Sequence, residues 1–126
     1  MNKYGSTTWF IPDGFIPKKS SGELESHEAI CLLNSSKETA EITVTVYFEE
    51  DEPIKDIRFQ VKGERTKHIR TDYLVGKDEK KILRGVPYAL KVESSLPVIV
   101  QFSRMDATQS ANTLMTTMAY AINESY

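Results

Sequence analysis

The sequence lacks the features that mark secreted, disulfide-stabilised and membrane-spanning proteins. Its only cysteine, Cys31, can form no disulfide within the chain, so nothing in the sequence requires an oxidising compartment. No apolar run reaches the ~18 residues that a membrane-spanning helix needs. The polar residues 1–8 also lack the apolar stretch of a secretory signal. These absences predict a cytoplasmic protein that does not insert into membranes.

A large excess of charge of either sign is also missing. Sixteen Lys and Arg residues against eighteen Asp and Glu residues give a net charge of −2 at pH 7. Binding to nucleic acid depends on clustered basic residues that neutralise phosphates. The charge balance therefore argues against nucleic acid as a partner. Direct DNA contact by a regulator is the least favoured of the functions considered.

The sequence does contain alternating apolar and polar residues, which are typical of half-buried strands. In residues 42–48 the even positions are apolar, so Ile42, Val44, Val46 and Phe48 are predicted to face the core. The same alternation recurs in residues 57–62, 88–93 and 98–103. Several short strands separated by turn residues predict an all-β sandwich or barrel, and 126 residues suit a single domain over residues 1–126.

Four other segments break this regular pattern. Residues 27–34 are apolar on both faces, which predicts either a central strand with a covered outer face or a subunit contact. Residues 11–26 are rich in proline and glycine and predict an ordered excursion. Residues 71–85 predict a loop that starts with a helical turn capped by Thr71 or Asp72. Residues 106–120 fit either a helix or a loop followed by a strand.

Polar residues gather in three clusters, which are predicted to lie at strand ends: residues 26–28, 65–70 and 101–106, the last followed by Gln109. A metal site is disfavoured, because no metal-binding spacing occurs and adjacent strand residues such as His27 and Glu28 point to opposite faces. The chain also lacks a glycine-flanked nucleophile and a glycine-rich phosphate loop. The sequence therefore predicts no enzymatic activity, no metal and no cofactor.

The arginines of these clusters have two interpretations. Arg65, Arg70 and Arg104 are planar donors that suit the recognition of carboxylates, phosphates or sugar hydroxyls, and Trp9 could form a stacking wall for such a ligand. Alternatively the arginines form structural ion pairs, for example Arg104 with Asp106 at a strand end. The residues alone leave a ligand pocket and structural pairing equally open.

An ordered set of short segments runs from about residue 9 to residue 121. It consists of Trp9, Asp-Gly-Phe-Ile-Pro at 13–17, Ser-His-Glu at 26–28, Cys-Leu-Leu-Asn at 31–34, residues 42–48, Glu-Pro at 52–53, Arg-Thr-Lys-His-Ile-Arg at 65–70, residues 96–101, Ser-Arg-Met-Asp at 103–106, Gln109 and Ala-Tyr-Ala at 119–121. This set resembles the sensory rhodopsin transducer family. Residues 71–85 diverge from the family, so any partner specificity that lies there does not transfer.

The resemblance implies a jelly-roll-like β-sandwich of about eight strands that assembles as a homotetramer and has no enzymatic activity. It also implies a signalling module that binds a small polar, carbohydrate-like ligand and relays the signal to a protein partner. The candidate ligand-binding residues are Trp9, His27, Glu28, Arg65, His68, Arg70, Gln101, Arg104 and Asp106. The alternative is a protein adaptor for a membrane photoreceptor, in which the motif residues are structural and the loops at 11–26 and 71–85 carry recognition.

Overall fold

The computed structural model describes residues 4–19, 24–109 and 111–122, and nearly all of its regular structure is β-strand. The strands are β1 (Ser6–Gly14), β2 (His27–Asn34), β3 (Ala40–Phe48), β4 (Ile54–Val61), β5 (Arg65–Arg70), β6 (Tyr88–Asp106), β7 (Thr113–Met118) and β8 (Tyr120–Ala121). Two short 3-10 turns, η1 (Thr71–Tyr73) and η2 (Lys77–Glu79), lie between β5 and β6. No helix within these described ranges is long and apolar enough to cross a membrane. The predicted all-β fold of about eight strands is confirmed.

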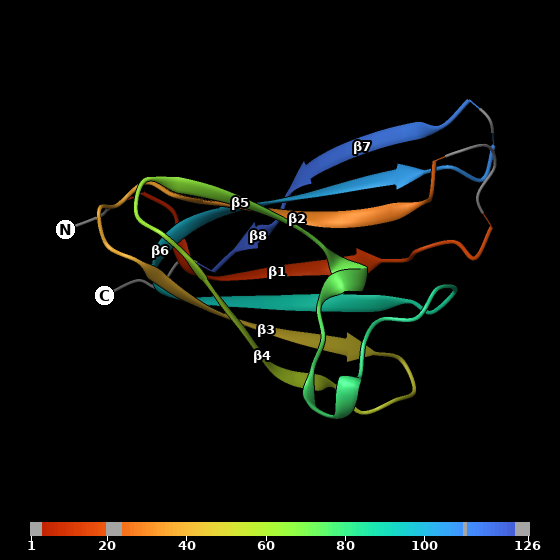
Figure 1. Ribbon diagram of the computed structural model, residues 1–126, viewed down its shortest axis with the longest axis horizontal. Helices are drawn as coiled ribbons and strands as arrows, with labels where there is room; N and C mark the ends of the chain where they lie inside the picture. The colour runs from red at the N-terminus through yellow and green to blue at the C-terminus, as the bar shows by residue number, and fades with distance from the viewer. Residues whose placement is uncertain (1–3, 20–23, 110, 123–126) are drawn as a thin grey trace.

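The long strand β6 belongs to both layers of the sandwich (Figure 1). Its first half pairs with β1 and β3 in a sheet with the order β4-β3-β6-β1-β8. Its second half pairs with β2 and β7, which gives a second sheet with the order β5-β2-β6-β7. The change of partner falls between Ser94, which pairs with Ile42, and Ile99, which pairs with Leu33. All these pairings are antiparallel, and the sandwich fold is confirmed.

The core lies between the two sheets, and the predicted alternation builds it. Ile42, Val44 and Val46 of β3 are at most 1% exposed, and Phe48 at the end of the strand is half-buried. Inward side chains of the second sheet complete the same cluster, including Ile30, Leu32, Val100 and Phe102. Burying one such side chain contributes about 1.5–3 kcal/mol. The apolar positions therefore decide which face of each strand turns inward.

Three strand boundaries differ from the prediction. Residues 88–93 and 98–103 belong to one strand rather than two, because the chain continues straight from one sheet into the other. Pro97, which has no backbone N–H to donate, lies within the stretch where the strand changes partners. Residues 65–70 form the whole of β5 rather than a strand end. Residues 11–14 belong to β1, so the excursion that follows starts only at Phe15.

The remaining segments settle the open alternatives. A helical turn does begin at Thr71, but its N-cap is Arg70 and no side chain caps it. The predicted cap is wrong because the Thr71 hydroxyl meets Tyr88 and the Asp72 carboxylate accepts from Arg70. Residues 106–109 and 111–120 form the end of β6, a loop, β7 and the start of β8 rather than a helix, and residue 110 lies outside the described residues. Residues 20–23 of the predicted excursion lie outside the described residues.

Candidate functional site

A carboxylate is buried at the start of β2, where Glu28 points inward and is only 1% exposed. Its Oε1 accepts hydrogen bonds from the backbone N–H of Phe15, at 3.0 Å, and from the Tyr88 hydroxyl. Its Oε2 accepts from Nε of Arg104. The Tyr88 hydroxyl also lies 2.9 Å from Oγ1 of Thr71. We call Glu28, Thr71, Tyr88 and Arg104 the buried network.

Burial governs the electrostatics of this network. Loss of water around Glu28 raises the pKa of its carboxyl, although hydrogen bonds from Tyr88 and the charge of Arg104 act in the opposite direction. Burial also raises the pKa of the Tyr88 hydroxyl, and the nearby Glu28 carboxylate raises it further. Tyr88 therefore remains a neutral donor at neutral pH. The network is a satisfied ion pair in which every carboxylate oxygen has a donor.

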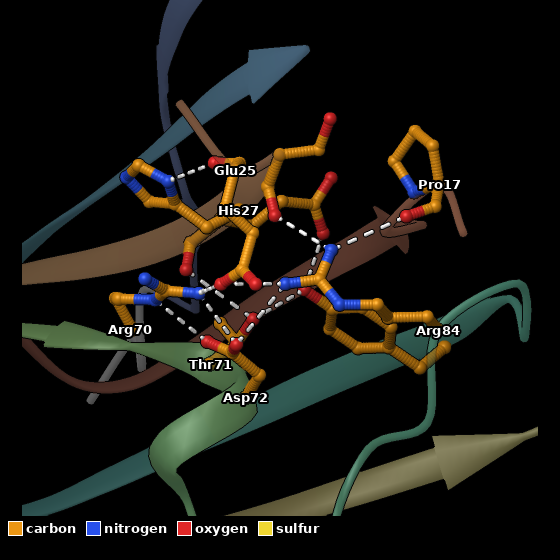
Figure 2. A network of polar contacts seen from close by, with 10 residues as sticks. Pro17, Glu25, His27, Arg70, Thr71, Asp72 and Arg84 are labelled. Atoms are coloured by element: carbon orange, nitrogen blue, oxygen red, sulfur yellow. Dashed lines mark hydrogen bonds and ion pairs between the residues drawn. The ribbon is translucent and has the colours of Figure 1, made fainter. Parts of the chain in front are cut away.

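A second set of charged residues lies nearer the surface and is drawn in Figure 2. Arg70 holds Asp72 with two hydrogen bonds, of 3.0 Å from Nε and 2.7 Å from Nη2. The same Nη2 lies 2.7 Å from Oε1 of Glu25, and Nη2 of Arg84 lies 3.0 Å from that oxygen. Hydrogen bonding from Arg70 lowers the pKa of Glu25. We call Glu25, Arg70, Asp72 and Arg84 the loop clamp.

The loop clamp ties two long connections together. Arg84, in the connection from β5 to β6, donates to the backbone carbonyls of Pro17 and Ser26 at 3.2 and 2.8 Å (Figure 2). Both carbonyls belong to the connection from β1 to β2. The Ser26 hydroxyl in turn accepts from the backbone N–H of Ala107 at 2.8 Å. The clamp therefore holds segments that are distant in sequence as one unit at this end of the sandwich.

Three of the predicted site residues make their hydrogen bonds outside both networks. Trp9 is buried, and its indole N–H points to the carbonyls of Ser6 and Val98, each at 3.0 Å. Arg65 lies at the opposite end of β5 from Arg70, where it donates to the nearby backbone carbonyls of Gly63 and Glu64. Asp106, at the end of β6, accepts from the hydroxyl and backbone N–H of Thr108. These residues do not converge on one pocket.

Three other predicted residues, His27, His68 and Gln101, fall on the outer face of the second sheet. Cys31 links two of them, because it lies opposite His68 on one side and Gln101 on the other. Nδ1 of His27 lies 2.9 Å from the Glu25 carbonyl, so His27 turns outward where Glu28 turns inward, as predicted for neighbours on a strand. The structure thus brings together only Glu28 and Arg104, with Arg70 in the loop clamp beside them.

The outer face of the second sheet is weakly polar at its centre. The residues that share the central part of this face by register, on β2, β6 and β7, are Ala29, Cys31, Leu33, Ile99, Gln101, Ser103, Met105, Leu114, Thr116 and Met118, whereas β5 adds Thr66, His68 and Arg70 at its edge. We call the part on β2, β6 and β7 the central outer face. None of the residues of the central outer face is charged, and Leu33 is 42% exposed. Strand β2 is central between β5 and β6, as predicted, but the covered outer face predicted with it is not found, because nothing in the described residues covers that face. Such a surface is typical of a protein contact.

A groove of about 280 Å³ opens between β1 and β7. Aromatic and sulfur side chains line it, including Phe10, Phe102, Met115 and Tyr120. Arg104 lies at this groove, where its Nη2 approaches the Asp13 carbonyl at 3.3 Å. Of the nine predicted site residues, Arg104 alone lines it. Within the described ranges, no group of three or more metal-ligating side chains occurs.

Several residues of the two networks were not among the predicted site residues. Tyr88 shows only as an inward position of an alternating strand, and its hydroxyl gives no signal in the sequence. Asp72 and Arg84 fall in the segment predicted as a loop, where no periodicity tells which side chains meet. The one available signal for Glu25 and Arg84 was their position within the two long segments that break the strand pattern, residues 11–26 and 71–85.

Similarity to known proteins covers nearly the whole chain. The family model described as Anabaena sensory rhodopsin transducer matches residues 4–121. A crystal structure of Thermotoga maritima 1070 is 37% identical, with a TM-score of 0.82, and the match covers 99% of this chain and 100% of that one. The structure of the Anabaena sensory rhodopsin transducer is 33% identical, with a TM-score of 0.71, over 81% of this chain and 97% of that one. No curated protein sequence matches. The chain belongs to the Anabaena sensory rhodopsin transducer family.

Proposed function

We propose that this protein is a non-enzymatic signalling adaptor that acts in the cytoplasm as a homotetramer and binds a membrane photoreceptor of the sensory rhodopsin type. Membership of the transducer family supports the adaptor role. The name of the 33% identical structure, a sensory rhodopsin transducer, supports the class of partner. The uncharged part of the outer face that β2, β6 and β7 form supports assembly with further copies of the chain.

The observation that carries the proposal is the loop clamp. Its two arginines bind Glu25, Asp72 and backbone carbonyls, so they hold the loops together. The two connections that the clamp holds expose large apolar side chains: Leu24 is 51% exposed, Tyr73 is 66% exposed and Leu83 is 62% exposed. Loops held in one conformation lose little entropy on binding, which favours recognition of another protein.

The test is binding to a sensory rhodopsin held in lipid nanodiscs, measured with the 126-residue chain labelled at its N-terminus. Tyr73→Ala combined with Leu83→Ala is expected to weaken binding at least tenfold. Tyr120→Ala is the matched control, because Tyr120 is equally exposed, at 67%, but lies on β8. Equal loss in the control would contradict recognition by the clamped loops. Failure of the unmodified chain to bind would contradict the photoreceptor as partner.

A second candidate function is the binding of a small polar ligand, such as a sugar or a sugar acid. The groove between β1 and β7 favours it, because the groove joins aromatic walls to the guanidinium of Arg104. Thermal denaturation with monosaccharides, sugar acids and inorganic phosphate would test this function. A rise in melting temperature that is lost in Met115→Lys, which blocks the groove, would support it. No rise with any of these compounds would exclude it for these ligand classes.

A further inference from the structure

A groove of about 550 Å³ lies between the connection from β3 to β4 and the connection from β5 to β6. Its apolar lining comes from Phe48, Ile54, Leu83 and Val86. Ile54 is buried, whereas Leu83 is 62% exposed. In Figure 1, η2 lies beside the start of β4, where these two connections meet. An apolar surface is therefore open to solvent on one of the connections that the loop clamp holds.

The connection from β5 to β6 is packed closely where it forms a wall of this groove. A Cβ atom on Gly76 would lie 2.2 Å from Cγ2 of Ile54, so glycine lets the backbone approach β4 closely. The N–H of Gly76 donates to the carbonyl of Lys80 at 2.7 Å, and Val75 pairs with Lys81, which closes a short loop. A groove whose walls are already ordered loses little entropy when a partner binds.

Carboxylates line the groove beside its apolar residues. Asp51 and Glu52 come from the first connection, and Asp78 and Glu79 come from the second. The ion pairs of the described residues include none of these four side chains. Two lysines also line the groove, so four acidic and two basic residues leave it a net charge of −2. The whole chain has the same net charge, so its excess of negative charge is concentrated here. We call this site the acidic groove.

The negative surface continues beyond the acidic groove. A neighbouring depression of about 300 Å³ shares Phe48 with it and is lined by Asp13 and Glu49, while none of its described lining residues is basic. Tyr47, at the same depression, is 36% exposed. Together the two depressions offer a length of surface that combines apolar and acidic groups. Such a surface suits an extended chain segment better than a small rounded ligand.

We propose that the acidic groove binds an extended basic segment of a protein partner. An apolar side chain of this segment packs beside Leu83, and the Lys or Arg side chains on either side of it lie against the four carboxylates. The proposal rests on the proposed function, because it names the part of the membrane photoreceptor that the loops recognise. Cytoplasmic loops of membrane proteins carry an excess of Lys and Arg close to the membrane.

Charge complementarity favours this occupant over others. Opposite charges on two partners speed their encounter and fix their orientation, whereas like charges placed opposite one another suppress binding. The phosphates of a nucleic acid or of an anionic lipid would meet the unpaired carboxylates of the acidic groove. A basic segment instead gains attraction from the carboxylates and buries the exposed part of Leu83.

The first experiment measures binding to a sensory rhodopsin in nanodiscs of phosphatidylcholine, a lipid without net charge. Glu52→Lys combined with Glu79→Lys reverses two charges of the acidic groove and is expected to weaken binding at least tenfold at low salt. Glu38→Lys combined with Glu64→Lys is the matched control, because both residues are exposed and lie beyond the opposite ends of β3 and β4. The control changes the net charge equally and should change affinity by less than about twofold. Circular dichroism checks that both variants keep the sheet signal.

The second experiment tests the acidic groove without the photoreceptor. The probe is a fluorescein-labelled peptide, Lys-Arg-Lys-Leu-Arg-Lys-Arg, and its binding is followed by fluorescence anisotropy at low salt. It should bind the unmodified chain and the control variant, and bind the groove variant at least tenfold more weakly. Replacing its leucine by serine should also weaken binding to the unmodified chain, since the apolar contact is lost. A peptide that does not bind, or that binds both variants equally, would overturn the proposal.

The two experiments separate this proposal from the proposed function. Rhodopsin binding that the groove variant keeps in full would overturn the acidic groove as a docking site and leave the adaptor role in place. An unmodified chain that binds the peptide through the groove but binds no rhodopsin would overturn the photoreceptor as partner. That result would support the acidic groove as a site for basic segments.

Discussion

The buried network and the loop clamp use the same chemical groups, and they differ in their access to water. In the buried network the central carboxylate, Glu28, is 1% exposed, and its donors come from β6 and from the segment after β1. In the loop clamp the side chains of Glu25 and Asp72 are 59% and 16% exposed. Ion pairs in water contribute little because solvation competes with them, whereas a buried charge that loses its partner is costly. The difference shows that the two networks have different structural roles.

The buried network fixes the interior geometry at one end of the sandwich. Glu28 belongs to β2, Tyr88 and Arg104 belong to opposite ends of β6, and Phe15 follows β1. One carboxylate thus joins three segments that are remote in sequence. The loop clamp instead fixes the surface that we propose for recognition, and its loss would change binding more than folding. The following predictions test this division, from the largest effect to the smallest.

Glu28→Ala is expected to lower the free energy of unfolding by about 3–5 kcal/mol, because it leaves Arg104 and the Phe15 N–H without their buried acceptor. Urea denaturation followed by circular dichroism measures the change. Glu38→Ala is the control, since Glu38 is an exposed glutamate whose loss should change stability by less than about 0.5 kcal/mol. If Glu28→Ala lowered the free energy of unfolding no more than Glu38→Ala does, the distinction between the two networks would not hold.

The next largest expected effect is the pH dependence of the stability that Glu28 contributes. Burial raises its pKa, so the folded chain binds this proton more tightly than the unfolded chain does. The part of the stability that depends on this proton is fully present below the unfolded value of ~4.3 and is lost as the pH rises through the raised folded value. A tenfold difference in proton affinity between the folded and unfolded chains corresponds to about 1.4 kcal/mol of stability.

Glu28→Gln isolates this effect because glutamine does not titrate. The unfolding free energy of the unmodified chain minus that of Glu28→Gln is therefore expected to fall as the pH rises from about 4 to about 8. Urea denaturation at intervals across this range measures the difference. A difference that grows with pH would mean that the arginine and tyrosine outweigh burial at this carboxyl.

Asp72→Asn is expected to cost about 0.5–1 kcal/mol, because its pairs with Arg70 and Arg84 remain partly exposed. This cost should shrink in about 1 M salt, where the screening length falls to ~3 Å. The cost of Glu28→Ala should change little under the same conditions, since buried pairs are screened much less. Equal salt sensitivity of the two variants in urea denaturation would argue that the networks share one environment.

Arg65→Ala is expected to have the smallest effect, within about 0.5 kcal/mol in either direction. Arg65 is exposed and donates to the carbonyls of Gly63 and Glu64. Thermal denaturation of this variant beside Arg104→Ala compares two arginines that the sequence alone could not distinguish. If Arg65→Ala lowered the stability as much as Arg104→Ala, burial would not explain any difference between the two arginines.

The sequence predicted the fold better than the site, for a physical reason. Alternation reports which face of a strand is buried, so it placed Val44 and Val46 in the core and set Glu28 and His27 on opposite faces. The identity of a polar partner depends instead on the crossing of distant segments. Predicting the pairing of Glu28 with Arg104 requires the register of β2 against β6. Predicting the contacts of Arg84 requires the path of the connection between β5 and β6.

The same limitation explains the grouping of the predicted ligand-binding residues. Apart from Trp9, which was proposed as a stacking wall, they were grouped because each lies in one of the three polar clusters, yet these clusters fall on different faces and ends of the strands. Arg65 and Arg70 are five residues apart on β5 and therefore lie at its two ends. Membership of a motif indicates which strand or loop carries a residue. The direction of its side chain and its distance from other residues follow from the arrangement of the strands in the sheet.

The sharing of β6 between both sheets also affects how the chain reaches its native state. Strands β1, β2, β3 and β7 all pair with β6, which begins only at residue 88. Before β6 leaves the ribosome, only the ladders β3–β4 and β2–β5 have both of their strands available. Contacts between residues far apart in sequence slow folding, because loop closure must precede their formation. The chain is therefore expected to complete its folding in a late, cooperative step, after synthesis has passed residue 106.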